Sequence, residues 1–321
     1  MTRTLLVDPS SRGGLPVYTT LVARSLAAAG AQPETLASVA LDPAAADPAV
    51  VRRLPDDRWG AAPRLGPLAF PERLWRWCRS ARAVEREVRT FRPDVVHFQA
   101  PLNRRLDAFL LRRLSRRTAV VWTAHNVLPF ERTPEDSARF AEIYRAVDRV
   151  IVHTPPAATA LRELAGVEPV VVDHPVPEPL VQLERAEARE RLGLEPDGRL
   201  LVALGFIRAY KGYDLLADVW EGLGAAAPRL LVLGELHAES QRPVLERLAQ
   251  TGRADVRIGY ASDTELHTAL AAADALLLPY VTASDSGLLH LARAFGVPVI
   301  ASDAPELAAS VRAARAGAGV P

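Results

Sequence analysis

The sequence LLVALGFIRAYKG occupies residues 200–212 and joins five apolar residues to a loop that carries two cations. A continuous apolar run of this length is typical of a strand buried on both faces, as in a parallel sheet covered by helices. The amphipathic stretch 213–223 predicts a helix after the loop. Parallel α/β folds bind phosphate groups at such strand-to-helix junctions. Residues 200–212 therefore predict a buried strand followed by an anion site at Arg208 and Lys211.

Lys211 is the only lysine in the chain, because 38 of the 39 Lys plus Arg residues are arginine. A lysine places a compact, strongly hydrated point charge in a protein that otherwise uses the planar guanidinium. A surface lysine that points into water is the simpler explanation of one such residue. The neighbouring Arg208 and the position of the loop, where a buried strand meets a helix, favour the anion site.

The pattern of residues 200–223 recurs through the chain. Short apolar runs predict strands at 4–7, 95–98, 119–123, 149–153, 170–173, 200–204, 230–233, 256–258, 275–278 and 299–301. Between them, residues 17–29, 213–223, 264–273 and 287–295 repeat apolar residues at helical spacing. Alternating strands and helices predict an α/β protein built from doubly wound parallel sheets.

The chain is predicted to form two domains, since 321 residues exceed the usual size of one. Pro175, Pro177 and Pro179 favour a stiff extended connector, and strand patterns lie on both sides of it. We expect two Rossmann-like domains, at residues 1–176 and 181–321, with parallel sheets that face each other across a cleft. Residues 42–72 show no clear period and predict a loop with short helical pieces.

Composition excludes several classes of protein. No stretch approaches the roughly 18 apolar residues that span a bilayer, and the N-terminus has no signal pattern. Cys78 is the only cysteine, which excludes an internal disulfide and a thiolate metal cluster and favours a cytoplasmic location. Residues 1–180 carry 25 Arg against 20 Asp plus Glu, too small an excess to indicate nucleic-acid binding.

Two junctions in the first half of the chain also carry candidate residues. Gly13 and Gly14 join a strand to a helix, where they either let the backbone approach an anion or form an ordinary turn. His125 follows the strand 119–123, either at the ligand-binding edge of the sheet or in a local hydrogen bond. His97 lies within a strand and is expected to pack in the core. The remaining histidines have no spacing that is typical of a metal site.

The junction at residues 279–288 reads PYVTASDSGL. Asp285 and Ser286 stand at helix-capping positions, so a structural cap is one interpretation. In the other, the N–H groups at Ser286, Gly287 and Leu288 bind a phosphate or a sugar hydroxyl, and Asp285 accepts from another hydroxyl. Both interpretations use the same strand-to-helix geometry.

Taken together, these segments resemble the family 4 (group 1) glycosyltransferases. The resembling segments, in chain order, are 13–14, 122–126, 205–212, 256–260, 273–279 and 286–302. The resemblance implies the GT-B fold, a nucleoside-diphosphate sugar bound mainly by the C-terminal domain, and an acceptor bound by the N-terminal domain. Members of this family generally retain the anomeric configuration and need no metal or further cofactor.

The resemblance implies a role for each candidate residue. Arg208 and Lys211 match the Arg and Lys that bind the donor diphosphate and neutralise charge on the leaving group. Gly13 and Gly14 match the loop that approaches the diphosphate from the other domain, and His125 matches a histidine near the donor sugar. The other positions of the donor site that the resemblance implies are Gly205, Tyr260, Asp285, Ser286, Gly287 and Leu288.

Two features depart from the family pattern. Many members carry two glutamates where this chain has Ala283 and Leu291. Ser286-Gly287 resembles the Ser-Gly version of this motif in a subset of bacterial polysaccharide-type members. The chain also ends at Pro321, where members continue into C-terminal helices, so the second domain is expected to lack them or the sequence to be incomplete. These departures keep a non-catalytic sugar-nucleotide-binding partner protein open as an alternative, and phosphate-dependent cleavage of sugars as a third hypothesis.

Residues 70–92 hold seven Arg together with Trp75 and Trp77. A basic helix with tryptophan can lie on an anionic membrane, which suits a lipid-linked acceptor and a place at the inner membrane face. A solvated helix face above core tryptophans explains the same residues. Both interpretations remain open from the sequence.

Overall fold

The structure is a computed structural model that describes residues 1–41, 50–55, 69–130, 132–282 and 286–318. The chain divides into two compact units, Met1–Pro175 and Val176–Pro321. The division falls at the proline-rich segment 175–179, where the missing N–H groups of proline prevent a strand or helix from continuing.

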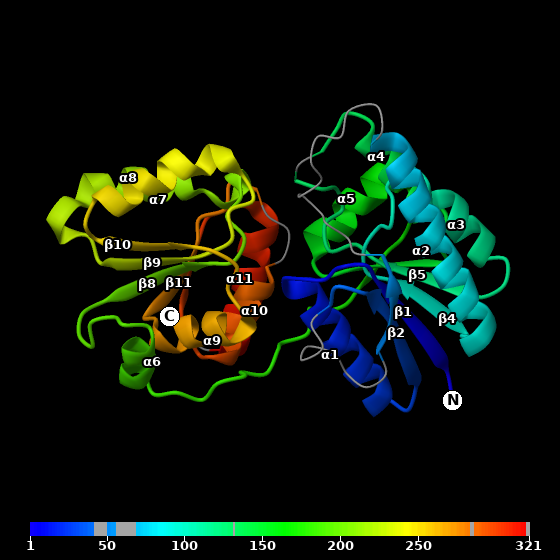
Figure 1. Cartoon of the computed structure of the whole chain (residues 1–321), viewed down its shortest axis with the longest axis horizontal. Coiled ribbons are helices and arrows are strands. Elements are labelled where there is room, and N and C mark those ends of the chain that lie inside the picture. The colour runs from blue at the N-terminus through cyan, green and yellow to red at the C-terminus, as the bar shows by residue number, and fades with distance from the viewer. Residues whose placement is uncertain (42–49, 56–68, 131, 283–285, 319–321) are drawn as a thin grey trace. The chain divides into compact units, whose positions relative to one another are not determined.

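Within the described residues, the first unit contains a seven-stranded sheet in the order β3-β2-β1-β4-β5-β6-β7 (Figure 1). All neighbouring strands are parallel. The strands are β1 (Arg3–Asp8), β2 (Gln32–Ser38), β3 (Val50–Leu54), β4 (Val95–Phe98), β5 (Ala119–Thr123), β6 (Arg149–Val152) and β7 (Val170–Val171). The helices are α1 (Gly14–Ala28), α2 (Ala69–Phe91), α3 (Asp107–Leu114), α4 (Asp136–Arg145) and α5 (Pro155–Ala165).

The described part of the second unit contains a five-stranded parallel sheet in the order β10-β9-β8-β11-β12. Its strands are β8 (Leu200–Leu204), β9 (Arg229–Gly234), β10 (Ala254–Ile258), β11 (Ala275–Leu278) and β12 (Val299–Ala301). The helices are α6 (Arg185–Arg191), α7 (Tyr213–Leu223), α8 (Arg242–Gln250), α9 (Asp263–Ala272), α10 (Gly287–Ala294) and α11 (Pro305–Ala318), with short 3₁₀ turns η2 (Ala209–Lys211), η3 (Gly224–Ala226) and η4 (Glu239–Gln241).

Both sheets reverse their strand order beside their first strand. β1 lies between β2 and β4, and β8 lies between β9 and β11. At such a switch point the loops that leave the two neighbouring strands diverge, so a ligand can enter at the carboxyl edge of the sheet. The loop after β8 and the loop after β11 leave the second sheet on either side of its switch point. The topology therefore positions residues 205–212 and 279–288 for ligand binding.

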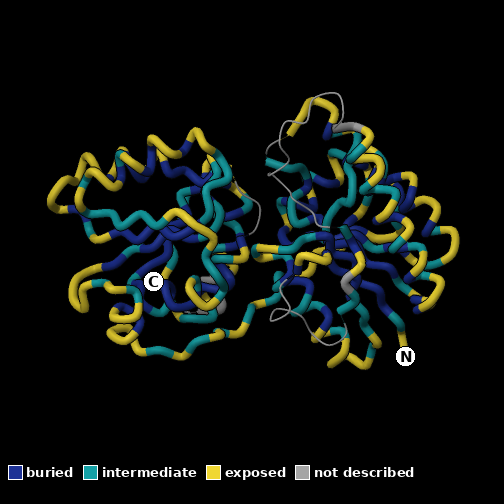
Figure 2. Tube along the Cα trace, viewed as in Figure 1, coloured by how far each residue is buried: buried dark blue, intermediate teal, exposed yellow. Residues whose placement is uncertain are grey.

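Buried residues follow the strands and the inner faces of the helices in each unit (Figure 2). In the first unit, Phe98 and Trp122 stack with ring centroids 5.9 Å apart, within a core that also contains Tyr144. In the second unit, Leu276 and Trp220 belong to separate clusters. Burying one such side chain contributes roughly 1.5–3 kcal/mol, so these clusters account for the continuous apolar runs of the strands.

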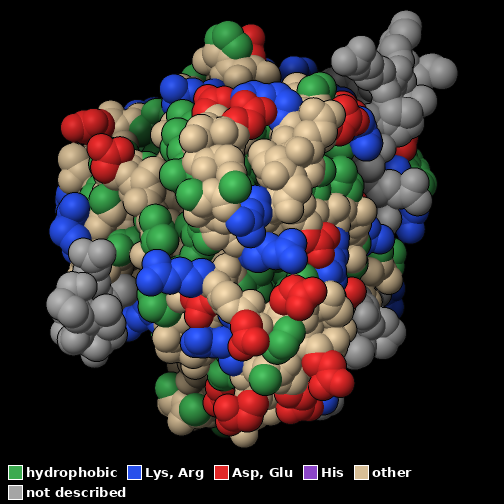
Figure 3. Space-filling view, turned by 90° about the vertical axis from the view of Figure 1, so that its left-hand side faces the viewer, with side chains coloured by type: hydrophobic (Ala, Val, Ile, Leu, Met, Phe, Trp, Pro, Cys, Tyr) green, Lys and Arg blue, Asp and Glu red, His purple; other side chains and the backbone are tan. Residues whose placement is uncertain are grey.

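One face of the second unit carries acidic and basic side chains close together (Figure 3). Arg247 pairs with Asp218 and Glu221, and Arg242 pairs with Glu239. Opposite charges at these distances compensate each other, although exposed pairs stabilise a fold by less than about 1 kcal/mol.

The predicted fold class is confirmed, but the sequence prediction missed two strands. β2 begins with Gln-Pro-Glu-Thr, and only its last four residues are buried, so no apolar run marks it. β3 lies inside residues 42–72, and the prediction of a loop with helical pieces is wrong there because parallel pairing with β2 holds Val50–Leu54 as a strand. α2 also begins inside that range, at Ala69. Within the described residues, no helix is both long and apolar enough to span a bilayer.

Candidate functional site

Two glycines determine the path of the loop after β8. Gly205 has a φ of +84° and Gly212 a φ of +74°, in the left-handed region that favours glycine. A Cβ added to Gly212 would lie 1.9 Å from the carbonyl oxygen of Pro279, so a larger residue would displace the backbone. This close approach joins the loop after β8 to the loop after β11.

Lys211 is buried at this junction, with only 8% of its surface exposed. Its Nζ donates to the carbonyl oxygen of Leu204 at 3.2 Å and lies 5.4 Å from the ring centroid of Tyr280. Burial, and after it the charge of Arg208, lower the pKa of Lys211 to about 7. Burial therefore excludes the explanation that Lys211 is a surface lysine that points into water. A bound anion would favour the positively charged form of this amine.

The start of α10 meets the same place. A Cβ on Gly205 would lie 3.3 Å from Nζ of Lys211 and 3.5 Å from Cδ1 of Leu288. Ser286 is the N-cap residue of α10, yet its side chain makes no capping hydrogen bond and instead bonds with Tyr280. The N–H groups in the first turn of a helix have no partner within that helix. The N–H groups of Gly287 and Leu288 can therefore donate to an anion beside Lys211.

Arg208 supplies a second cation from the same loop. Its Nη2 lies 3.3 Å from Nδ1 of His237, and its Cζ lies 5.9 Å from the ring centroid of Phe206. After burial, the positive charge of Arg208 also lowers the pKa of Lys211. Two adjacent cations and a helix N-terminus can together bind a group with several negative charges, such as a diphosphate.

The structure does not bring the other predicted residues of the second unit into contact with Arg208 and Lys211 among the residues that it describes. Tyr260 follows β10, which is separated from β8 by β9, and it is 49% exposed. Asp285 and Ala283 lie outside the described residues. Leu291, at the position of the second family glutamate, is buried in the core, so it offers nothing to a ribose.

In the first unit, α1 begins at Gly14, after the loop that leaves the carboxyl end of β1. Gly13 is the N-cap residue of α1 with φ 80° and ψ −162°, a conformation almost restricted to glycine. The first turn of α1 contains no acidic side chain that would compensate the positive end of the helix dipole. This N-terminus is therefore suited to an anionic ligand.

His125 follows β5 and lies beside α1. Its ring centroid is 4.5 Å from that of Tyr18, and its Nε2 is 3.4 Å from Oε1 of Gln99. The structure thus combines the two interpretations from the sequence, because His125 lies at the carboxyl edge of the sheet and also has a local polar contact.

Tyr18 also contacts two further histidines, His153 and His174, for which the sequence predicted no role. The rings of His153 and His174 lie 5.3 and 5.1 Å from its ring. His97 is buried as expected, its Nε2 lies 2.7 Å from Oγ1 of Thr123, and burial lowers its pKa to about 4. One histidine lies in β4, and one follows each of β5, β6 and β7 within three residues. This recurrence at the same edge of the sheet is a sequence signal that could have predicted this group of histidines.

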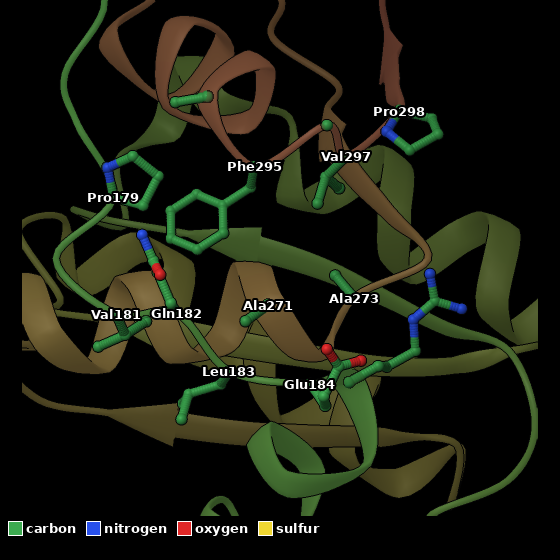
Figure 4. Close-up of a pocket in the computed structure, with 13 residues that line it drawn as sticks. Pro179, Val181, Gln182, Leu183, Glu184, Ala271, Ala273, Phe295, Val297 and Pro298 are labelled. Carbon is green, nitrogen blue, oxygen red and sulfur yellow. The ribbon is translucent and has the colours of Figure 1, made fainter.

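A pocket of about 390 Å³ lies at the opposite edge of the second sheet (Figure 4). Phe295 projects into it beside Pro179 and Gln182. Its walls include the residues that lead into β11 and β12, so it lies at the amino ends of those strands, away from Lys211. Within the described residues, no group of three or more His, Cys, Asp or Glu side chains could hold a metal ion.

Two family models match the chain. Residues 12–177 match the model for Glycosyltransferase Family 4, and residues 198–321 match the model for Glycosyl transferases group 1. Both matches follow the order expected from the sequence motifs, with the division between them near the proline-rich segment.

Solved structures of low sequence identity show the same fold. Sucrose-phosphate synthase from Thermosynechococcus elongatus has a TM-score of 0.71 at 17% identity, over 95% of this chain and 82% of that chain. The Anabaena protein HepE, solved in complex with UDP and glucose, has a TM-score of 0.65 at 16% identity, over 95% of this chain and 81% of its own. This is the predicted GT-B fold.

Curated relatives share more of the sequence. D-inositol 3-phosphate glycosyltransferase 1 of Catenulispora acidiphila is 31% identical over 95% of this chain and 78% of its own length. A D-inositol 3-phosphate glycosyltransferase of Streptomyces bingchenggensis is 33% identical over 59% of this chain, but the match covers only 46% of that protein. A mannosylfructose-phosphate synthase of Agrobacterium fabrum is 32% identical over 42% of this chain and 33% of its own. The motifs, the fold and these matches together show that the chain belongs to glycosyltransferase family 4.

Proposed function

We propose that this protein transfers a sugar from a nucleoside diphosphate to an acceptor hydroxyl, with retention of configuration and without a metal or other cofactor. The observation that carries the proposal is the convergence of Arg208, the buried Lys211 and the N-terminus of α10 at the switch point of the second sheet. The enzyme class is supported by relatives named as glycosyltransferases, which also disfavour a non-catalytic partner protein. The solved complex of HepE with UDP and glucose supports a sugar-nucleotide donor.

The proposed chemistry follows from the charges. When the bond between the anomeric carbon and the diphosphate oxygen breaks, the electron pair remains on the diphosphate. Arg208, Lys211 and the N–H groups of α10 stabilise this developing charge, because they are already oriented in a partly dry site. In a retaining reaction the leaving phosphate oxygen can take the proton of the acceptor hydroxyl, so the protein mainly positions the reactants.

A screen of donors tests the proposal directly. UDP-, GDP- and dTDP-sugars are added in turn, and a ligand that binds only the folded state raises the melting temperature by mass action. Sugar transfer is then measured with inositol phosphates and hexose phosphates as acceptors, which the names of the relatives suggest. Lack of binding by every nucleotide sugar would overturn the proposal.

Lys211→Ala tests the assigned site. We expect a loss of about 2–4 kcal/mol of transition-state stabilisation, comparable to removing one strong oxyanion contact. The measurement is kcat and kcat/KM with the best donor of the screen. Arg199→Ala is the matched control, since it removes a cation from the exposed amino end of the same strand, β8, and should leave both constants unchanged. Turnover of the Lys211 variant close to that of the parent would refute the role.

We also propose that α2 contacts an anionic membrane, which would suit a lipid-linked acceptor. Trp75 is 55% exposed and Leu74 37% exposed, and the guanidinium of Arg79 lies 4.6 Å from the Trp75 ring centroid. Trp77 instead donates from its Nε1 to Asp107 at 3.0 Å and packs against the core. The two tryptophans therefore differ, and Trp75 is the one available to a bilayer.

Flotation with vesicles that contain or lack phosphatidylglycerol tests the membrane contact. We expect the parent to float only with the anionic vesicles and Trp75→Ala to lose at least half of that binding, because an interfacial aromatic anchor is removed. Leu215→Ala, which changes an exposed residue of α7, is the control. If the parent does not float with anionic vesicles, the membrane contact is excluded.

A further inference from the structure

The loop after β9 is attached to the loop after β8 by backbone contacts. A Cβ on Gly234 would lie 1.9 Å from the carbonyl oxygen of Gly205, so only glycine permits this approach. Beyond it, the N–H of Ile207 donates to the carbonyl oxygen of Glu235 at 2.7 Å, and the N–H of His237 donates to that of Ile207 at 3.0 Å. The backbone therefore places the side chains of Glu235 and His237 beside the loop of the candidate donor site.

The contact between His237 and Arg208 indicates which tautomer the imidazole adopts. Nη2 of Arg208 lies 3.3 Å from Nδ1 of His237. A guanidinium can only donate hydrogen bonds, so Nδ1 must accept and the proton of the neutral imidazole lies on Nε2. Nε2 is 3.6 Å from Oε2 of Glu235, and this carboxylate favours the tautomer with the proton on that side. The result is a chain of contacts from Glu235 through His237 to Arg208.

Phe206 fixes the plane of the imidazole. Its ring stacks on that of His237, with centroids 4.3 Å apart and an angle of 29° between the planes. The same aromatic ring lies 5.9 Å from Cζ of Arg208, within the range of a cation–π contact. The guanidinium is thus held from two directions, by an aromatic ring and by a hydrogen-bond acceptor.

The contacts of Arg208 with Phe206 and His237 oppose the repulsion between its charge and that of Lys211. The positive charge of Arg208 and that of Lys211 repel each other when no anion is bound, and this repulsion adds to the larger effect of burial in lowering the pKa of Lys211. A long side chain under this repulsion would otherwise turn into water, and binding a ligand would then cost about 2 kcal/mol of rotamer entropy. An acceptor that holds the guanidinium near Lys211 reduces that cost.

We propose that His237, oriented by Phe206 and Glu235, is a positioning residue that holds Arg208 ready for the donor diphosphate. The proposal rests on the proposed function, in which Arg208 binds that group. This role requires an acceptor at the position of Nδ1, because a guanidinium can only donate hydrogen bonds.

The test compares His237→Asn, whose carbonyl oxygen can replace Nδ1 as an acceptor but cannot be protonated, with His237→Leu, which has no acceptor. UDP, GDP and ADP are titrated into the parent, and the tightest binder serves as the probe. At pH 8 we expect His237→Leu to weaken binding at least tenfold and His237→Asn by no more than about threefold, since hydrogen bonds to charged groups contribute about 1.5–3 kcal/mol. Glu239→Gln, at an exposed acid of the same segment, should leave the dissociation constant unchanged.

One further readout separates positioning from a structural role. In an Arg208→Ala background, His237→Leu should have no further effect on binding. An equally large further loss in the Arg208→Ala background would overturn the inference.

The experiments distinguish failure of the proposed function from failure of the positioning role alone. If none of the three nucleotides binds the parent, or if Arg208→Ala binds the probe as well as the parent does, the proposed function is wrong and the inference falls with it. If Arg208→Ala loses binding while His237→Leu binds normally, only the positioning role of His237 is wrong. Thermal unfolding of each variant shows whether the fold is intact.

Discussion

Lys211 combines a positive charge with burial, and this combination links ligand binding to protons. Its pKa in the folded chain, about 7, lies below the value of 10.5 for an exposed lysine. Between these values the unfolded chain holds more protons than the folded chain, so the contribution of Lys211 to stability rises as the pH rises from about 7 to 10.5. A bound diphosphate favours the ammonium and should raise the pKa again.

We therefore predict that nucleotide binding at pH 8 takes up close to one proton. The measurement is the calorimetric enthalpy of UDP binding in two buffers with different ionisation enthalpies. Lys211→Met should bind more weakly and take up no proton. Because Lys211 is the only lysine, selective labelling of lysine also gives a single side-chain NMR signal whose titration reports its pKa. A midpoint near 10.5 in the free protein would contradict the prediction.

The residues of the site differ in how far the sequence reveals them. Arg208 and Lys211 could be predicted because they directly follow an apolar run, and the end of a parallel strand is where ligands bind. His237 could not, since it is 29 residues from Arg208 and reaches it only through the approach of Gly234 to Gly205. A contact between loops of adjacent strands depends on the register of the sheet, which no local pattern encodes.

The loop after β8 depends on Gly212 for its contact with the loop after β11. Gly212→Ala combines a strained φ of +74° with a Cβ 1.9 Å from the carbonyl oxygen of Pro279. We expect it to lower the free energy of unfolding by at least about 3 kcal/mol. Gly193→Ala, at φ +65° with open space around its Cβ, is the matched control and should cost only about 1 kcal/mol of strain. Urea denaturation measures both, and equal losses would show that the close approach contributes nothing.

Strands with a continuous apolar run were predictable, whereas strands held by their neighbours were not. The residues of β5, β8 and β11 agree with the sequence prediction at both ends, since all three lie inside a sheet. β3 lies at the edge of the first sheet. The sequence around it is rich in Pro and Asp and shows no strand pattern, and pairing with β2 holds it as a strand. Edge strands need less burial, so their sequences carry a weaker signal.

At the scale of the whole molecule, each unit combines its own core with its own candidate residues. Arg208, Lys211 and Ser286 belong to the second unit, whereas Gly13 and His125 belong to the first. In both units these residues follow the carboxyl ends of strands, where parallel α/β folds bind ligands. Motifs that are far apart in the sequence therefore occupy equivalent positions in the two sheets. The family resemblance implies a role in donor binding for residues of both sets.

Hydrogen exchange with and without donor nucleotide tests this prediction over the whole chain. We expect UDP to slow exchange at 205–212 and 286–289, because their N–H groups lie in the loop and the helix terminus that we propose bind the phosphates. A UDP-sugar should add protection at residues 13–18 and 124–126. Residues 294–298, beside the pocket at the amino edge of the second sheet, should be unaffected and serve as the internal control. Lys211→Ala should lose the protection at 205–212. Protection of the second unit alone, even with a sugar nucleotide at saturation, would mean that Gly13, Gly14 and His125 act on the acceptor or only on the fold.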